Sequence, residues 1–209
     1  MDPSPSLRLR TGALLAGAGI AFAAFPLLRP WGDKAGSLSA MADAFASPWW
    51  VIAHALGMLG WILLAAVVTI VGERGPSVLL LVGVASMLPF YGAETFGLHG
   101  LARYAAVIDD PSLVRAEALI RGDLLAQGLF ALGMVVAAIA VAVLALRLRR
   151  RRGVRWAAGA AAVLIALYLP QFFAPDALRI AHGVLLGMAL IGWTLAAATP
   201  RPQITSSRQ

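Results

Sequence analysis

Long runs of apolar residues, interrupted by short charged segments, dominate this sequence. Charged residues are absent from 44–72 and again from 124–146. A segment of about 18 or more apolar residues has the length of a membrane-spanning helix, which rises about 1.5 Å per residue. Six such runs are present, at 11–28, 49–72, 77–96, 124–146, 156–173 and 178–198. They predict six transmembrane helices.

The composition excludes an ordinary soluble domain. Hydrophobic residues make up 60% of the 209 residues and charged residues only 13%, so the chain cannot supply a polar surface. In lipid, apolar segments of this kind must be helical, because every backbone polar group needs an internal partner. We therefore predict an all-α, polytopic integral membrane protein, with 1–209 as a single transmembrane domain and the lipid bilayer as its partner. The absence of cysteine excludes disulfides, cysteine-ligated clusters and thiol nucleophiles.

The basic residues predict the orientation of the chain. A pI of about 11.2 is typical of nucleic-acid-binding proteins, but these arginines flank the apolar runs, where they determine topology. With the N-terminus inside, the inner side holds eleven basic residues and the outer side six. The inner set is Arg8, Arg10, Arg74, Arg147, Arg149, Arg150, Arg151, Arg152, Arg155, Arg201 and Arg208. The outer set is Arg29, Lys34, Arg103, Arg115, Arg121 and Arg179.

This distribution predicts cytoplasmic N- and C-termini and no nucleic-acid partner. The abundance of Ala, Gly and Arg indicates a bacterial plasma membrane. The first run is long for a signal peptide, and we expect it to remain as a helix. The longest predicted connection, 97–123, contains Asp110 and Pro111 as a helix start and Gly122 as a stop. It predicts a short interfacial helix at 111–121, acting as a lid or as a plain connector.

An internal repeat divides the predicted helices into three hairpins. Ile52-Ala53-His54 in the second helix matches Ile180-Ala181-His182 in the sixth, and each is followed by Leu-Gly-Met. Pro26, Pro89 and Pro170 lie near the outer ends of the preceding helices. Repeats of this type place binding sites between the repeated units. Two small-residue faces, Gly183 with Gly187 and Ala13 with Gly17 and Ala21, predict close helix packing, within the chain or with a membrane-protein partner or second copy.

Polar side chains gather at the outer ends of the predicted helices, and ionisable groups within a membrane are functional candidates by default. The set is His54, Tyr91, Glu94, His99, Tyr168, Gln171, Arg179 and His182. Arg179 could hold an anionic headgroup, pair with Asp176 or extend to the interface. Trp31, Trp49 and Trp50 predict an aromatic belt at the same level.

Three chemical interpretations of this set remain open beside a purely structural one. His54 and His182 could be the axial ligands of a haem b. The three histidines and Glu94 could instead bind zinc, copper or iron, if Gly97 breaks the helix between Glu94 and His99. Alternatively, the set could line an outward-facing pocket for a lipid, quinone or small metabolite, with Glu94 as proton acceptor. In the structural interpretation the histidines cap helices at the interface.

Two family resemblances accompany these patterns. PFYGAETFGLHGLARYA, which begins at Pro89, together with LYLPQFFAP and RIAHG, resembles uncharacterised six-helix membrane proteins of high-GC Gram-positive bacteria. That group has no established activity to carry over. The Ile-Ala-His segments also resemble those of cytochrome b561-type six-helix haem proteins, which have four haem-ligating histidines. Only His54 and His182 match them here, so this resemblance implies at most one haem.

The expected function follows from these observations in two classes. The first is a multi-pass membrane protein with a His/Glu pocket in the outer half of the helix bundle, binding a haem, a metal or a lipid-like ligand. The second is a transporter-like or purely structural membrane subunit without chemistry. The sequence does not decide whether the protein is an enzyme.

Overall fold

The computed structural model describes residues 4–151 and 153–198. Over these residues every regular element is helical, which confirms the all-α prediction. In chain order they are α1 (Pro5–Leu28), η1 (Gly32–Lys34), α2 (Leu38–Ala46), α3 (Pro48–Val71), α4 (Arg74–Gly92), η2 (Ala93–Gly97), α5 (Leu98–Val107), η3 (Pro111–Ala116), α6 (Glu117–Arg121), α7 (Leu124–Leu148), α8 (Arg155–Ala166), η4 (Pro170–Phe173) and α9 (Asp176–Ala198). The predicted cytoplasmic tail at 199–209 lies outside the described residues.

Five helices in the described part of the chain are long and apolar enough to cross a membrane. They are α1, α3, the continuous helix formed by α4, η2 and α5, α7 and α9. The remaining predicted segment, 156–173, is not one long helix. Its helix α8 has 12 residues and ends before Pro170, whose ring and missing N–H oppose continuation of an α-helix. The short η4 turn follows it.

Local sequence signals begin and end these helices. The Ser47 side chain accepts a hydrogen bond from the Trp49 backbone N–H, and Pro48 occupies the first turn of α3, as expected for an N-cap and its preferred successor. Gly72 ends α3 with φ of 81°, a left-handed conformation that glycine adopts without steric cost. Asp123 caps α7 by accepting from the Ala126 N–H.

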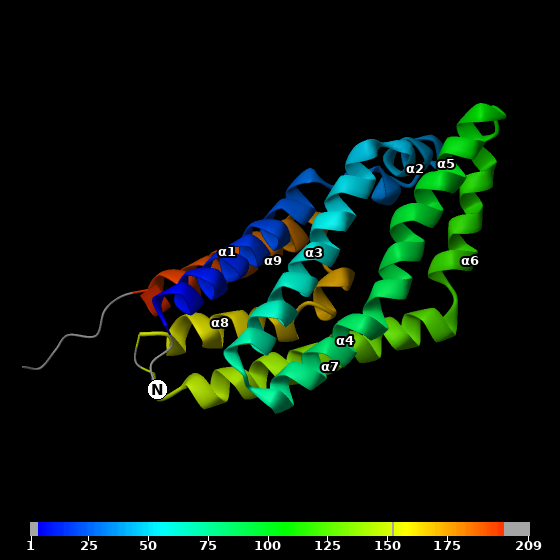
Figure 1. Cartoon of the computed structure of the whole chain (residues 1–209). Coiled ribbons are helices and arrows are strands. Elements are labelled where there is room, and N and C mark those ends of the chain that lie inside the picture. Colours follow the sequence, from blue (N-terminus) through cyan, green and yellow to red (C-terminus); the bar gives the residue numbers. More distant parts are fainter. Residues whose placement is uncertain (1–3, 152, 199–209) are drawn as a thin grey trace, which may run out of the picture.

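The long helices form a closed ring in which each packs against its neighbours along the chain. Contacts join α1 to α3, α3 to α4, α4 to α7, α7 to α8, α8 to α9, and α9 back to α1 (Figure 1). Two antiparallel contacts are especially close. A Cβ at Gly83 of α4 would lie 2.7 Å from the Gly133 carbonyl oxygen of α7, and a Cβ at Gly19 would lie 2.7 Å from the Gly187 carbonyl oxygen. Small residues are what allow backbones to approach this closely.

The small-residue faces seen in the sequence are used within this ring. Gly183 and Gly187 both face α1, where a Cβ would meet Pro26 and Gly19 at 2.5 Å. A Cβ at Gly17 would lie 3.3 Å from the Leu63 side chain of α3. These residues therefore pack helices of one chain together.

The third predicted helix is much longer than 77–96, because the predicted connection that starts at Gly97 is helical as far as Val107. Helical structure runs without a break for 34 residues, Arg74–Val107, or about 51 Å at the usual rise. A hydrocarbon core is about 30 Å thick, so this helix is longer than the thickness of such a core. The apolar run ends near Phe96, but Leu98, Ala102 and Ala105 continue one buried helical face. That face packs against α2 and η3.

The segment 111–121, predicted to be an interfacial helix, is helical as η3 followed by α6, with Asp110 accepting a hydrogen bond from the Ser112 N–H. Together α2, α5, η3 and α6 form a cap at one end of the bundle (Figure 1). The cap has its own small core, which includes Phe45, Trp50, Leu98 and Val114. Trp50 is 0% exposed, so its assignment to an interfacial aromatic belt is wrong, whereas Trp49 is half exposed.

Candidate functional site

A partly enclosed cavity of about 320 Å³ lies beneath the cap, between residues of α1, α4, α7 and α9. Aromatic rings form much of its wall: Phe25, Phe90, Tyr91, Phe130 and Phe172. Charged side chains also line it: Arg29, Lys34, Glu94, Arg121 and Arg179. This size falls within the range of small-molecule sites, which are about 300–1,000 Å³.

A π-helical segment positions Glu94 at the cavity. The residues of η2, Ala93–Gly97, depart from the α-helical pattern, and such segments are often found at functional sites. Thr95 donates from its hydroxyl to the Tyr91 carbonyl oxygen at 2.6 Å. The indole N–H of Trp50 donates to the backbone oxygen of Glu94 at 3.1 Å. The backbone of η2 is thereby tied to α3, and the Glu94 side chain is directed to the cavity.

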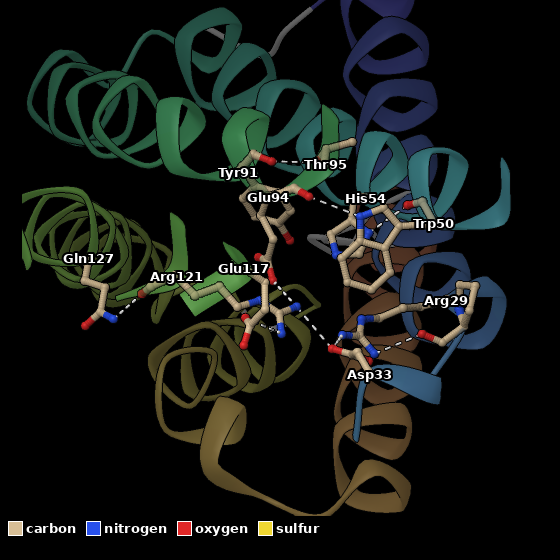
Figure 2. Close-up of polar contacts among 11 residues, drawn as sticks. Arg29, Asp33, Trp50, His54, Tyr91, Glu94, Thr95, Glu117, Arg121 and Gln127 are labelled. Atoms are coloured by element: carbon tan, nitrogen blue, oxygen red, sulfur yellow. Dashed lines mark hydrogen bonds and ion pairs between the residues drawn. The ribbon is translucent and has the colours of Figure 1, made fainter. Parts of the chain in front are cut away.

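Glu94 belongs to a network of buried and partly buried ion pairs that joins three parts of the chain (Figure 2). Arg121 of α6 lies 2.7 Å from the Glu94 carboxylate and 3.1 Å from Asp33. Asp33 also lies 2.7 Å from Arg29, and its side chain is 0% exposed. Glu117 adds a longer contact with Arg121 at 3.5 Å. The network connects α1 and η1 to α6 and η2, so it attaches the cap to the bundle.

The network shifts the pKa values of its members outside the membrane-spanning segments. Burial alone would raise the pKa of Asp33, but the guanidinium groups of Arg29 and Arg121 outweigh it and hold that pKa below the ordinary value of 3.8. Burial alone would lower the pKa of Arg121, but the carboxylates of Glu94 and Asp33 raise it overall. Both groups therefore keep their charges across the physiological pH range.

Lys34 is one of several cations at this cavity, and its pKa is lowered. Desolvation is the largest cause of its lowered pKa, and Arg121, Arg179 and Arg29 lower it further, against the opposing effect of Asp33. Its side chain is exposed, at the mouth of the cavity. Four cations therefore line the cavity, whereas Glu94 is the single carboxylate among the lining residues.

Aromatic rings hold two of the arginines in place. The Arg29 guanidinium carbon lies 4.3 Å from the ring centre of Trp31 and 4.8 Å from that of Trp50. The guanidinium carbon of Arg179 lies 4.9 Å from Trp31 and 5.4 Å from Phe172. These distances are typical of cation–π contacts. The rings of Trp31, Trp50 and Phe172 thus stabilise these two guanidinium groups at this end of the bundle.

Of the eight site residues predicted from the sequence, four line the larger cavity: His54, Tyr91, Glu94 and Arg179. His54 is buried between Trp50 and Phe25. Its Nδ1 lies 2.7 Å from the Trp50 carbonyl oxygen, which accepts only if Nδ1 carries the proton. In the neutral imidazole this leaves Nε2 as a hydrogen-bond acceptor for the cavity.

Three further predicted residues lie at a separate, smaller cavity of about 10 Å³, which Arg179 also lines. These are Tyr168, Gln171 and His182. The Nε2 of His182 lies 2.7 Å from the Leu164 carbonyl oxygen, so this histidine links α9 to α8. A space of about 10–15 Å³ holds a single water molecule. This smaller cavity therefore does not extend the binding site.

His99 lies at neither cavity. Its Nδ1 is 2.7 Å from the Phe45 carbonyl oxygen, one of the last carbonyls of α2, which have no partner within their own helix. The helix is not broken at Gly97, so Glu94 and His99 do not face a common site. The function of His99 in the fold is to fasten α5 to α2.

The described residues do not group the ligands that a metal site requires, and both histidines considered as haem ligands already have a backbone partner. Among the described residues, no three His, Asp or Glu side chains are grouped so that they could hold a metal ion. His54 contacts Phe25, whereas His182 contacts Tyr168. Each imidazole already bonds a backbone carbonyl, and in the described part of the chain ring contacts link the two only indirectly, through Tyr91, Phe130, Phe172 and Tyr168. Their positions match in the sequence repeat but their roles differ, because His54 bonds a carbonyl of its own helix through Nδ1, whereas His182 bonds a carbonyl of α8 through Nε2.

Reasoning from the sequence missed several charged residues of the site, among them Arg29, Asp33 and Arg121. The first two stand four residues apart directly after an apolar run, and Arg121 stands four residues after Glu117. Such spacing is a signal for ion pairs within a helix or turn. Arg121 also contacts Glu94 and Asp33, which are distant from it in the sequence, so no local sequence pattern predicts these contacts.

Comparison of the chain with protein-family models, with curated proteins and with solved structures finds no match. The two family resemblances therefore stay predictions. The function of the cavity has to be argued from its own chemistry.

Proposed function

We propose that this chain is a multi-pass membrane protein of a bacterial plasma membrane that binds a lipid-like ligand in the larger cavity. In this proposal 156–173 enters the membrane as a sixth segment, the helices form three hairpins, and the termini are cytoplasmic. The cap then lies on the outer side. A transporter-like or purely structural subunit is the competing function.

The charge distribution supports this orientation. Arg8 and Arg10 begin α1, Arg74 begins α4, and Arg147 ends α7. Figure 1 places these three helix ends away from the cap. Arg147 pairs there with Glu73, which joins the start of α4 to the end of α7. Basic residues concentrate on the cytoplasmic side of membrane proteins.

The observation that carries the proposal is the cavity itself, which joins rings and charges in one space of about 320 Å³. An aromatic wall provides contact for an apolar chain, and a few buried polar groups provide orientation, as in most small-molecule sites. The cavity lies in a membrane bundle, and the most abundant molecules with both properties there are amphiphiles. A lipid-like ligand therefore fits the lining better than a haem or a metal ion does.

The geometry favours binding over proton transfer. The Glu94 carboxylate is held by Arg121 at 2.7 Å, and a carboxylate beside a guanidinium is a weak base. We therefore assign Glu94 to the positioning of Arg121 and of the cap. His54 retains one free nitrogen for a ligand hydroxyl or acid.

The test fills the cavity without changing its charge. Ala131 lines the cavity, and Ala131→Phe places a ring in it. Ala181→Phe adds the same ring at an exposed position of α9 and is the matched control. Both variants are purified in phosphatidylcholine nanodiscs, and binding of the fluorescent amphiphile cis-parinaric acid is measured. We expect saturable binding by the wild type and the control, and a loss of at least about 10-fold in affinity for Ala131→Phe. Equal binding by all three would refute the cavity as the site.

A further inference from the structure

Arg179 is a buried cation that forms no direct ion pair in the described part of the chain, although Asp176, Asp33 and Glu94 act on it from a longer distance. Its residue is only 7% exposed, and its Nε is buried without a hydrogen-bond partner. Asp176, three residues earlier on α9, forms no ion pair with it. Charged residues are almost never buried in this way unless they are paired.

The protein cannot relieve this charge by releasing a proton. A guanidinium remains protonated in proteins, unlike a buried lysine. The rings of Trp31 and Phe172 contact it, but they provide only part of the stabilisation that a carboxylate or water would. No carboxylate among the described residues therefore pairs directly with Arg179 in the cavity that it lines, because Glu94 is held by Arg121.

The other cations of the cavity are accounted for differently. Arg29 and Arg121 are paired with Asp33 and Glu94. Lys34 is an exposed residue, so water shares in stabilising its charge. Arg179 is thus the position at which an incoming anion gains most, because the ion pair forms where water is largely excluded.

We infer that the ligand of this cavity is an amphiphilic anion, whose carboxylate or phosphodiester headgroup pairs with Arg179 while its apolar chain lies against Phe130 and Phe172. This inference rests on the proposed function and names the chemical class of its ligand. A guanidinium suits both headgroups, since it presents a fork of N–H donors to two oxygen atoms. Lys34, at the mouth, adds a second positive charge that attracts the headgroup.

The test compares an anion with its neutral counterpart. The probes are cis-parinaric acid and its methyl ester, which share one chain and differ in charge. Binding to the full-length protein in phosphatidylcholine nanodiscs is measured by energy transfer from its six tryptophans. The variants are Arg179→Gln, the conservative Arg179→Lys, and Arg115→Gln as the control. Arg115 is an exposed arginine of the cap that does not line the cavity. Phosphatidylglycerol and inorganic phosphate serve as competitors.

We expect the wild type and Arg115→Gln to bind the acid at least about 10-fold more tightly than the ester. Arg179→Gln should bind both probes equally, and Arg179→Lys should recover part of the preference. Competition by phosphatidylglycerol, but not by phosphate, assigns the site to a membrane lipid; competition by phosphate alone would exclude an amphiphile. If acid and ester bind the wild type equally, the anion inference is wrong and the cavity proposal stands. If neither binds, the proposed function fails as well.

Discussion

Asp33→Asn is the substitution that tests most directly how the cap is attached to the bundle. The carboxylate is 0% exposed and pairs with Arg29 at 2.7 Å and Arg121 at 3.1 Å. Asparagine keeps its shape but removes its charge. Breaking one partner of a buried ion pair costs about 3–5 kcal/mol, because the other charge stays buried without compensation.

The lower end of this range applies here. Arg121 keeps Glu94 at 2.7 Å, so Arg29 is the group that loses its partner. We expect a loss of about 3 kcal/mol in the free energy of unfolding, or about 6–12 °C in melting temperature for a chain of this size. The measurement is thermal unfolding in nanodiscs, followed by circular dichroism. Asp43→Asn, at an exposed position of α2, is the control, and we expect it to stay within about 0.5 kcal/mol of the wild type.

A second substitution and a pH series sharpen this test. Adding Arg29→Met to Asp33→Asn removes the unpaired cation and should recover much of the loss. Because the native pKa of Asp33 lies below its ordinary value of 3.8, the carboxylate stabilises the fold fully above that value. The stabilisation is lost only as the pH falls through the lower native pKa. The wild type and Asp33→Asn should therefore differ equally at all pH values above about 5 and converge in strong acid. A difference below about 1 kcal/mol at neutral pH would refute the account of the network.

Two further predictions concern helix packing and topology. Gly83→Ala places a Cβ 2.7 Å from the Gly133 carbonyl oxygen and should lower the melting temperature. The control Gly128→Ala has no atom within 4 Å of its Cβ and should raise the melting temperature slightly, because alanine favours helix over glycine by about 1 kcal/mol. Equal shifts for the two variants would contradict the close α4–α7 contact. The chain has no native cysteine, so Ser6→Cys and Ser112→Cys report topology: an impermeant thiol reagent on intact cells should label only the second, and the reverse result would invert the proposed orientation.

The helical, membrane-type fold was predictable from the sequence because its signal is one-dimensional. Apolar runs of bilayer length can be read without knowing which residues they meet. The limits of α4 and α5 were not, because past Phe96 the helix is stabilised by contacts of Leu98 and Ala102 with the cap, which hydropathy does not report. The break after α8 had a local signal in Pro170, which the apolar character of the flanking residues concealed.

The site was predictable in its location and only partly in its membership. His54, Tyr91, Glu94 and Arg179 were selected because polar groups in an apolar segment need a reason to be there, and they share one cavity. The same rule selected His99 and His182, whose partners are backbone carbonyls. The apolar residues around a histidine indicate that its imidazole is buried, but they do not indicate which atom the imidazole bonds.

The contact between α1 and α9 has a consequence for how this protein is made. Chains are synthesised and inserted from the N-terminus. Helix α1 can therefore pack against α3 early, whereas its glycine face has no partner until α9 has been synthesised. In the interval the surface of α1 around Gly19 is open to lipid or to other nascent helices. A stop codon before α9 would leave that surface of α1 uncovered permanently. Membrane proteases that degrade unfinished chains would then have a distinct surface to recognise.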